Sequence, residues 1–203
     1  MQNETKIQLS PFEQSLLKNA EWILTKNGIT EKIKLLLQQC LEKQQELIQI
    51  ENFSLPEEVT VISPKIARGE NYQGLPWLML DHPRYFDKEN VFAIRTFFWW
   101  GRYFSTTVHL AGTYKNISAK KIIDNFTSLS AQSFYVCVND KEWEHHFEED
   151  NYRLIKNISV NEFQQFIAEK KFIKLSVKFD LDKWNEIPLL TASIYKTIFE
   201  MLD

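Results

Sequence analysis

Residues 91–112 read VFAIRTFFWWGRYFSTTVHLAG and form the longest β-like stretch in the chain. As one straight strand, residues 91–111 would span roughly 70 Å at about 3.3 Å per residue. A domain of this length has a radius of gyration of only roughly 17 Å. The chain must therefore turn within the stretch, and Gly101 is the natural place for the turn. We predict a β-hairpin in which Gly101 and Arg102 form a two-residue turn.

The tip of this predicted hairpin carries aromatic side chains on both faces. With a two-residue turn, Trp100 lies opposite Tyr103, and Trp99 lies opposite Phe104 on the other face. Because they lie on opposite faces of the hairpin, the two aromatic pairs cannot both belong to one exposed surface. One pair is expected to enter the core, while the other packs under a helix or lines a binding face. The segment is thus predicted to be mostly buried and not a membrane-dipping edge.

Other parts of the chain also show strand patterns. Residues 172–181, FIKLSVKFDL, alternate between apolar and polar side chains, which predicts an antiparallel strand with one wet face. Between residues 59 and 112, glycine and proline separate short apolar runs that begin with VTVIS at 59–63. FYVCV at 134–138 and YRLIK at 152–156 predict two further short strands.

The N-terminal region shows helix signals instead. Ser10 before Pro11 predicts a cap followed by proline at the first helical position. Apolar residues then recur at helical spacing until Gly28, and Thr30 is placed to cap a second helix that reaches about residue 51. We therefore predict a helical hairpin over residues 1–52. Further helices are predicted after Ser118, after Ser159 and from about Pro188.

The order of these elements predicts an α+β fold. A chain of 203 residues fits one compact domain, with the helical hairpin at 1–52 and the α+β core at 57–203. We expect a mainly antiparallel central sheet with helices packed on it and a C-terminal helix.

Composition excludes several classes of protein. Hydrophobic residues make up 44% and charged residues 25% of the chain, which is typical of a folded domain. A net charge of −3 gives no general attraction to nucleic acid or anionic membranes. The N-terminus lacks a signal-peptide pattern, and no apolar run is long enough to span a membrane. We expect a cytoplasmic protein in which Cys40 and Cys137 are reduced and mostly buried.

Four of the five arginines lie within residues 68–102, although lysine is far commoner in the chain as a whole. The planar guanidinium group suits bidentate binding of carboxylate or phosphate. The predicted ligand-binding residues are Arg68, Arg84, Arg95, Arg102, Tyr72 and Glu70. The alternative is that these arginines form ordinary surface ion pairs. Arg95 is the most informative, because a charge in mid-strand needs either an open face or a dedicated partner.

Histidine offers the only candidates for acid–base chemistry. His82 and His109 are weak catalytic candidates, since no nucleophile elbow surrounds the serines near His109. The run EWEHHFEED at 142–150 does not match a known zinc motif, and it is better read as a solvated acidic helix or loop. The chain contains no glycine-rich nucleotide cradle. We expect no metal and no cofactor.

Three functions remain open from the sequence. The first is a binding domain that holds an anionic small molecule or an acidic partner segment on an arginine-lined sheet face. The second is an enzyme acting on such a ligand, with His82 or His109 as acid or base. The third is an assembly protein that uses the N-terminal helical hairpin as its interface. A homodimer is one form of such an assembly. The third predicts scattered arginines and a contiguous exposed apolar surface.

Overall fold

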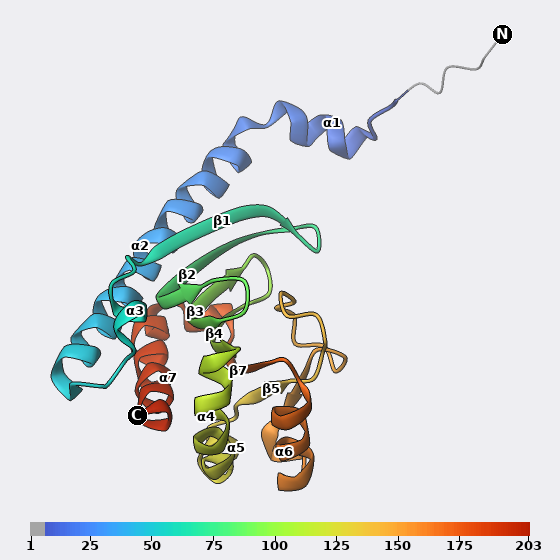
Figure 1. The fold of residues 1–203 in the computed structure, drawn as a ribbon. Coiled ribbons are helices and arrows are strands. Elements are labelled where there is room, and N and C mark those ends of the chain that lie inside the picture. Colours follow the sequence, from blue (N-terminus) through green and yellow to red (C-terminus); the bar gives the residue numbers. More distant parts are fainter. Residues whose placement is uncertain (1–6) are drawn as a thin grey trace.

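The computed structural model describes residues 7–203 (Figure 1). A single seven-stranded sheet lies at its centre, with helices along one side and a long connection between two strands along the other. The strands are β1 (Lys65–Tyr72), β2 (Leu75–Phe86), β3 (Val91–Trp99), β4 (Tyr103–Ala111), β5 (Tyr135–Cys137), β6 (Tyr152–Leu154) and β7 (Phe172–Phe179). The helices are α1 (Pro11–Lys18), α2 (Ala20–Glu51), α3 (Glu57–Thr60), α4 (Thr113–Asp124), α5 (Phe126–Ala131), α6 (Val160–Glu169) and α7 (Ile187–Leu202), with 3₁₀ turns η1 (Ile155–Asn157) and η2 (Leu181–Glu186).

The strands follow the order β1-β2-β3-β4-β7-β5-β6, and every neighbouring pair is antiparallel. The first four strands form a meander, and β7 then pairs with β4 so that the short strands β5 and β6 extend the far edge. This arrangement confirms the predicted α+β class, the antiparallel sheet and the C-terminal helix.

The β3–β4 hairpin turns where the glycine predicted it, with a register one residue away from the prediction. Trp99 pairs with Tyr103, and Phe98 pairs with Phe104. The connection therefore holds residues 100–102, and Gly101 adopts a φ of 66°, a conformation that costs glycine little. Aromatic side chains still occupy both faces of the hairpin, as the sequence predicted.

One face of the sheet packs on helices. Alternate strand residues, among them Phe98 and Phe104, contact α2, and those of the central strands contact α4 and α7. The main clusters on this face contain Leu36, Leu37, Leu78, Leu80, Phe98, Phe104 and, further along the sheet, Ile94, Val108, Leu110, Leu175, Tyr195 and Phe199. We call this the helix face.

The other face was predicted to be wet on β7, and this prediction is correct at the end of the strand, where Lys178 is exposed, but wrong in its middle. Lys174 is 1% exposed and Ser176 is fully buried, although both alternate with the core residues of the strand. The cover is the connection between β5 and β6, residues 138–151, which crosses the sheet (Figure 1). We call this connection the strap and the surface beneath it the strap face.

The predicted N-terminal hairpin is also wrong. Helix α2 is continuous from Ala20 to Glu51 and passes through Gly28, where a Cβ would meet nothing within 4 Å. A lone glycine costs a helix only about 1 kcal/mol, which is too little to end one flanked by good helix formers. The break instead lies at Asn19, whose side chain accepts a hydrogen bond from the Glu21 amide.

Helix starts were predicted well where a capping side chain is present. Ser10 and Ser159 each form a full capping box, with Glu13 and Glu162 respectively. Helix α4 begins at Thr113, five residues before the predicted cap, and the VTVIS run holds the short helix α3 instead of a strand.

Candidate functional site

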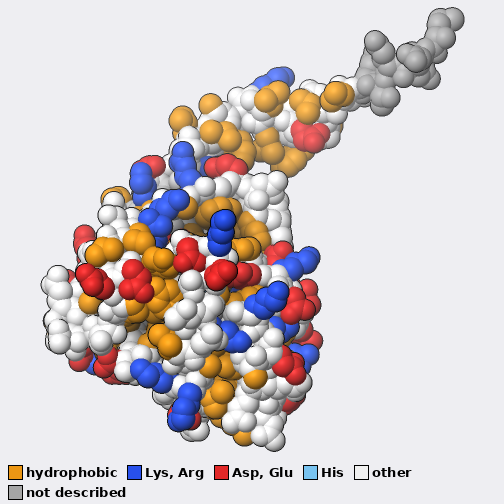
Figure 2. Space-filling model, viewed as in Figure 1, with side chains coloured by type: hydrophobic (Ala, Val, Ile, Leu, Met, Phe, Trp, Pro, Cys, Tyr) orange, Lys and Arg blue, Asp and Glu red, His pale blue; other side chains and the backbone are white. Residues whose placement is uncertain are grey.

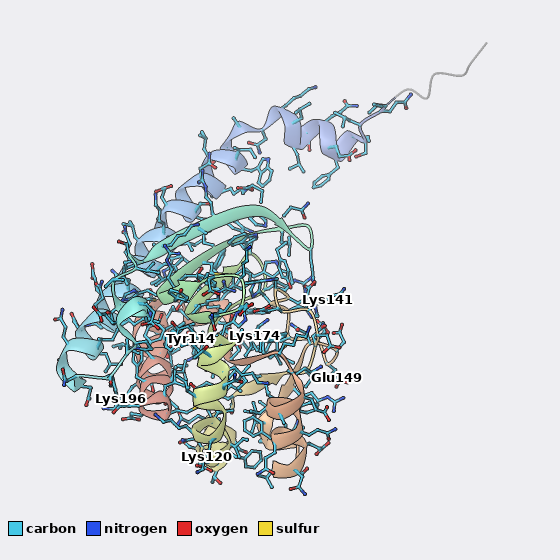
Figure 3. All side chains as sticks on the ribbon, in the orientation of Figure 1. Tyr114, Lys120, Lys141, Glu149, Lys174 and Lys196 are labelled. Atoms are coloured by element: carbon cyan, nitrogen blue, oxygen red, sulfur yellow. The ribbon has the colours of Figure 1, made fainter. Side chains whose placement is uncertain are left out.

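The strap face carries an unusual set of buried polar side chains. Strand alternation places Arg95 on β3, Thr107 and His109 on β4, and Lys174 and Ser176 on β7 toward the strap. All five are less than 8% exposed. Figure 3 shows Lys174 inside the molecule, whereas Lys120 and Lys196 lie at its periphery.

Arg95 has the dedicated partner that its mid-strand position required. Its Nε donates to Asp81 Oδ1 on β2 at 2.8 Å, and both side chains are almost fully buried. The guanidinium carbon lies 5.2 Å from the centre of the Phe86 ring and 5.1 Å from that of Trp143 in the strap. Trp143 is 53% exposed, so it covers Arg95 while its own outer side faces solvent. Arg95 thus binds one strand neighbour and one strap side chain.

His109 makes the second link between sheet and strap. Its Nε2 lies 2.7 Å from Glu142 Oε1. Burial lowers the pKa of His109 to about 4, despite the opposing effect of Glu142. The ring is therefore neutral near pH 7, with Nε2–H donating to the carboxylate. Among the described residues, its buried Nδ1 has no hydrogen-bond partner.

Lys174 and Tyr72 hold the backbone of the strap. Lys174 Nζ donates to the carbonyl oxygens of Glu142, at 2.9 Å, and of Glu144. Burial lowers the pKa of Lys174 to about 8. Tyr72 Oη accepts from the amides of His145 and His146 at 2.7 and 3.0 Å. It also lies 2.9 Å from Glu144 Oε2, and burial raises the pKa of Tyr72 to about 12.

These contacts assign a common role to the buried polar groups. Arg95, His109, Lys174 and Tyr72 come from four strands, and each one contacts the strap. His109, Lys174 and Tyr72 form hydrogen bonds to the strap, whereas Arg95 pairs with Asp81 on β2 and contacts the strap through the Trp143 ring. Chemistry on the strap face would therefore require the strap to move first.

The four predicted arginines do not converge on one pocket. Arg68 lies opposite Leu78, whose side chain belongs to the cluster on the helix face, so it points away from Arg95. Arg84 donates through Nε to the carbonyl oxygen of Ser63 at 2.9 Å. Arg102 lies at the β3–β4 turn with its guanidinium carbon 5.4 Å from the Trp99 ring. Glu70 pairs with Lys26 of α2 on the helix side.

The two histidine candidates are also apart. His82 borders a hollow of about 240 Å³ that is lined by α2 residues, while His109 lies beneath the strap. Burial lowers the pKa of His82 to about 4. Of the predicted site residues, only Arg95, Tyr72 and His109 come together. Lys174, Trp143 and Glu142 were not predicted as site residues. The one signal in the sequence was that Lys174 alternates with apolar residues in β7.

A second feature is the projecting N-terminal segment, residues 9–25, which we call the arm. It comprises α1 and the first turns of α2, and it reaches past the sheet (Figure 1). None of the residues of α1 is buried, and the first buried residue of α2 is Ile33. Figure 2 shows hydrophobic side chains along the arm. Its exposed large apolar residues are Leu9 (45%), Phe12 (70%), Leu17 (76%), Trp22 (45%), Ile23 (43%) and Leu24 (67%).

Two hollows lie at the bend between α1 and α2. One, of about 340 Å³, is lined by residues of both helices, including Leu16, Leu17 and Ile23. The other, of about 370 Å³, lies between α2 and Trp100 of the β3–β4 turn. Trp22 borders both hollows. The arm therefore presents apolar projections and apolar recesses side by side.

Comparison of the chain with models of protein families, with curated proteins and with solved structures gives no match. Within residues 7–203, no helix has the length and apolar character needed to cross a lipid bilayer.

Proposed function

We propose that this chain is an assembly protein that forms a homodimer by pairing its arm with the arm of a second copy. The observation that carries the proposal is the cluster of six exposed large apolar side chains on a helical segment that projects from the folded body. Isolated exposed apolar residues are common on monomers, but a contiguous set is typical of an interaction surface.

The size of the apolar surface supports a stable dimer. Complete burial of one such side chain contributes about 1.5–3 kcal/mol. Six side chains that are 43–76% exposed would together contribute, by that measure, on the order of 5–10 kcal/mol per chain. A symmetric dimer buries this set twice, whereas association costs about 4–15 kcal/mol. The balance favours a dimer.

The order of residues in the arm favours a second copy over an unrelated partner. Reading outward in both directions from the Asn19–Ala20 peptide, Lys18 corresponds to Glu21 and Leu17 corresponds to Trp22. Leu16 then corresponds to Ile23. Antiparallel pairing about a two-fold axis at this point would set Leu17 against Trp22 at the centre of the contact, with Lys18 and Glu21 of opposite charge at its rim.

The proposal is tested by sedimentation velocity of the full chain between about 1 and 100 µM. We expect a species of twice 24.2 kDa that dissociates on dilution. Leu17→Glu should raise the dissociation constant at least tenfold, because it sets a charge against an apolar pocket. The matched control is Leu189→Glu in α7, where the leucine is 69% exposed but lies outside the arm. It should leave the dissociation constant unchanged.

A charge exchange distinguishes a second copy from any other partner. Lys18→Glu alone sets two acids against each other across the axis and should weaken the dimer, and Glu21→Lys should do the same with two bases. The double variant Lys18→Glu/Glu21→Lys should restore wild-type association. A wild-type chain that stays monomeric at 100 µM would overturn self-association and leave the arm to a different partner.

A further inference from the structure

A hollow of about 330 Å³ opens beside the β3–β4 turn, at the end of the strap face. Arg102 of the turn and Lys178 of β7 line it, together with Glu148 of the strap and Asp180 just after β7. Trp99, Tyr103 and Phe147 contribute the smaller, apolar part of a lining that is mostly polar. Binding sites for small molecules begin at about 300 Å³, so the hollow can enclose a small metabolite.

Both cations of the hollow are held in place by aromatic rings. The guanidinium carbon of Arg102 lies 5.4 Å from the Trp99 ring centre. Lys178 Nζ lies 5.5 Å from the Phe147 ring centre and 5.6 Å from that of Tyr135. Such contacts position a cation without consuming its hydrogen-bond donors. Arg102 and Lys178 therefore keep their N–H groups for another acceptor.

The two acids of the hollow do not neutralise these cations. Within residues 7–203, neither Arg102 nor Lys178 forms an ion pair with Glu148 or Asp180, although all four side chains border the same space. They remain separated across the hollow.

We propose that this hollow binds a free α-amino acid with an aromatic or large apolar side chain. The ligand carboxylate would accept hydrogen bonds from Arg102 and Lys178, and its ammonium group would donate to Glu148 and Asp180. Because the ring faces of Trp99 and Phe147 are already covered, the ligand side chain would lie along the aliphatic stems of Arg102 and Lys178 and the edge of Phe147. A zwitterion matches the four charges of opposite sign, whereas a simple anion would leave both acids beside its own charge. This inference does not depend on dimer formation.

The test is isothermal titration calorimetry of the full chain with L-phenylalanine and two relatives that each lack one charge. 3-Phenylpropionate lacks the ammonium group, and phenethylamine lacks the carboxylate. We expect L-phenylalanine to bind and each relative to bind at least tenfold more weakly. Equal binding of 3-phenylpropionate would overturn the zwitterion assignment and indicate a simple anion site. No heat of binding with 10 mM L-phenylalanine, L-leucine or L-tryptophan would overturn the site altogether.

Substitutions locate the binding within the molecule. Arg102→Gln and Asp180→Asn should each weaken L-phenylalanine binding at least tenfold, and both change exposed side chains that the fold does not require. The matched control is Arg153→Gln, because Arg153 also lies over an aromatic ring, that of Phe166 at 5.7 Å, but does not line this hollow. It should bind as the wild type does. An equal loss in all three variants would overturn the assignment to this hollow.

Discussion

Protonation of buried histidine is expected to destabilise this protein in mild acid. Burial holds the pKa of His109 at about 4, against an ordinary value of 6.5. Between these two values the unfolded chain binds a proton that the folded chain does not. The stability that the neutral His109 contributes to the folded state is therefore fully present above pH 6.5 and is lost as the pH falls toward 4. A difference of this size between the folded and unfolded pKa corresponds to on the order of 3 kcal/mol of unfolding free energy.

In the window from pH 6.5 to 5 the buried histidines dominate the change, because ordinary carboxyl groups titrate mainly below it; burial also lowers the pKa of His145. Over this window, the same linkage relation predicts that protonation linked to His109 lowers the free energy of unfolding by roughly 1–2 kcal/mol. His82, whose pKa burial also lowers to about 4, should lower it by a similar amount. His109→Gln removes the titrating group and keeps an N–H donor for Glu142. The variant should therefore lose roughly 1–2 kcal/mol less stability than the wild type over the same window.

The assay is urea unfolding followed by tryptophan fluorescence, with wild type and variant at one protein concentration and half-unit steps of pH. The comparison uses the change in unfolding free energy with pH, so a different baseline stability of the variant does not matter. Parallel curves for the two proteins would refute the reasoning, because they would mean that His109 protonates normally in the folded state.

Two further substitutions test the helix and the ion pair. Gly28→Ala should raise the free energy of unfolding by up to about 1 kcal/mol, because the added Cβ meets nothing and alanine favours helix; a loss of stability in thermal unfolding would point to a turn at this position. Arg95→Met leaves Asp81 buried without a partner and should cost about 3–5 kcal/mol. The double variant Arg95→Met/Asp81→Leu should cost far less, and a double-mutant cycle with additive losses would contradict the pairing.

Local chemistry explains what the sequence predicted correctly. Ser10 and Ser159 satisfy the first amides of their helices with their own side chains, so each helix start depends only on neighbouring residues. Gly101 turns the chain because its φ of 66° disfavours other residues. The error of one residue in the hairpin register arose because two-residue and three-residue connections can share the same glycine.

The predictions that failed depended on contacts between distant residues. Arg68 and Arg95 are close in sequence, but strand pairing sets them on opposite faces, and a register shift in β1 and another in β2 hide that relation from simple counting. Lys174 follows the pattern of a solvent-facing residue, and only the strap removes it from water. No local pattern shows that residues 138–151 cross the sheet.

The buried charges of the strap face are better explained as groups that position the strap than as groups that stabilise the fold. Burial of paired charges is often no more stabilising than apolar packing, so an ion pair such as Arg95–Asp81 adds little net free energy to the fold. Directional hydrogen bonds instead fix the position of the strap backbone relative to the sheet. Lys174 binds the backbone carbonyl oxygens of Glu142 and Glu144 in the strap, and Tyr72 binds the amides of the two residues that follow.

These bonds determine where the end of the strap lies. Phe147 and Glu148 follow directly after the residues that Lys174 and Tyr72 hold, and both border the hollow at the β3–β4 turn. The polar network therefore sets one wall of that hollow, while Arg102 and Lys178 on the sheet set the other. A neutral His109 keeps its bond to Glu142 at the opposite end of the same segment. The acid sensitivity of His109 and the shape of the hollow are thus two consequences of one buried network.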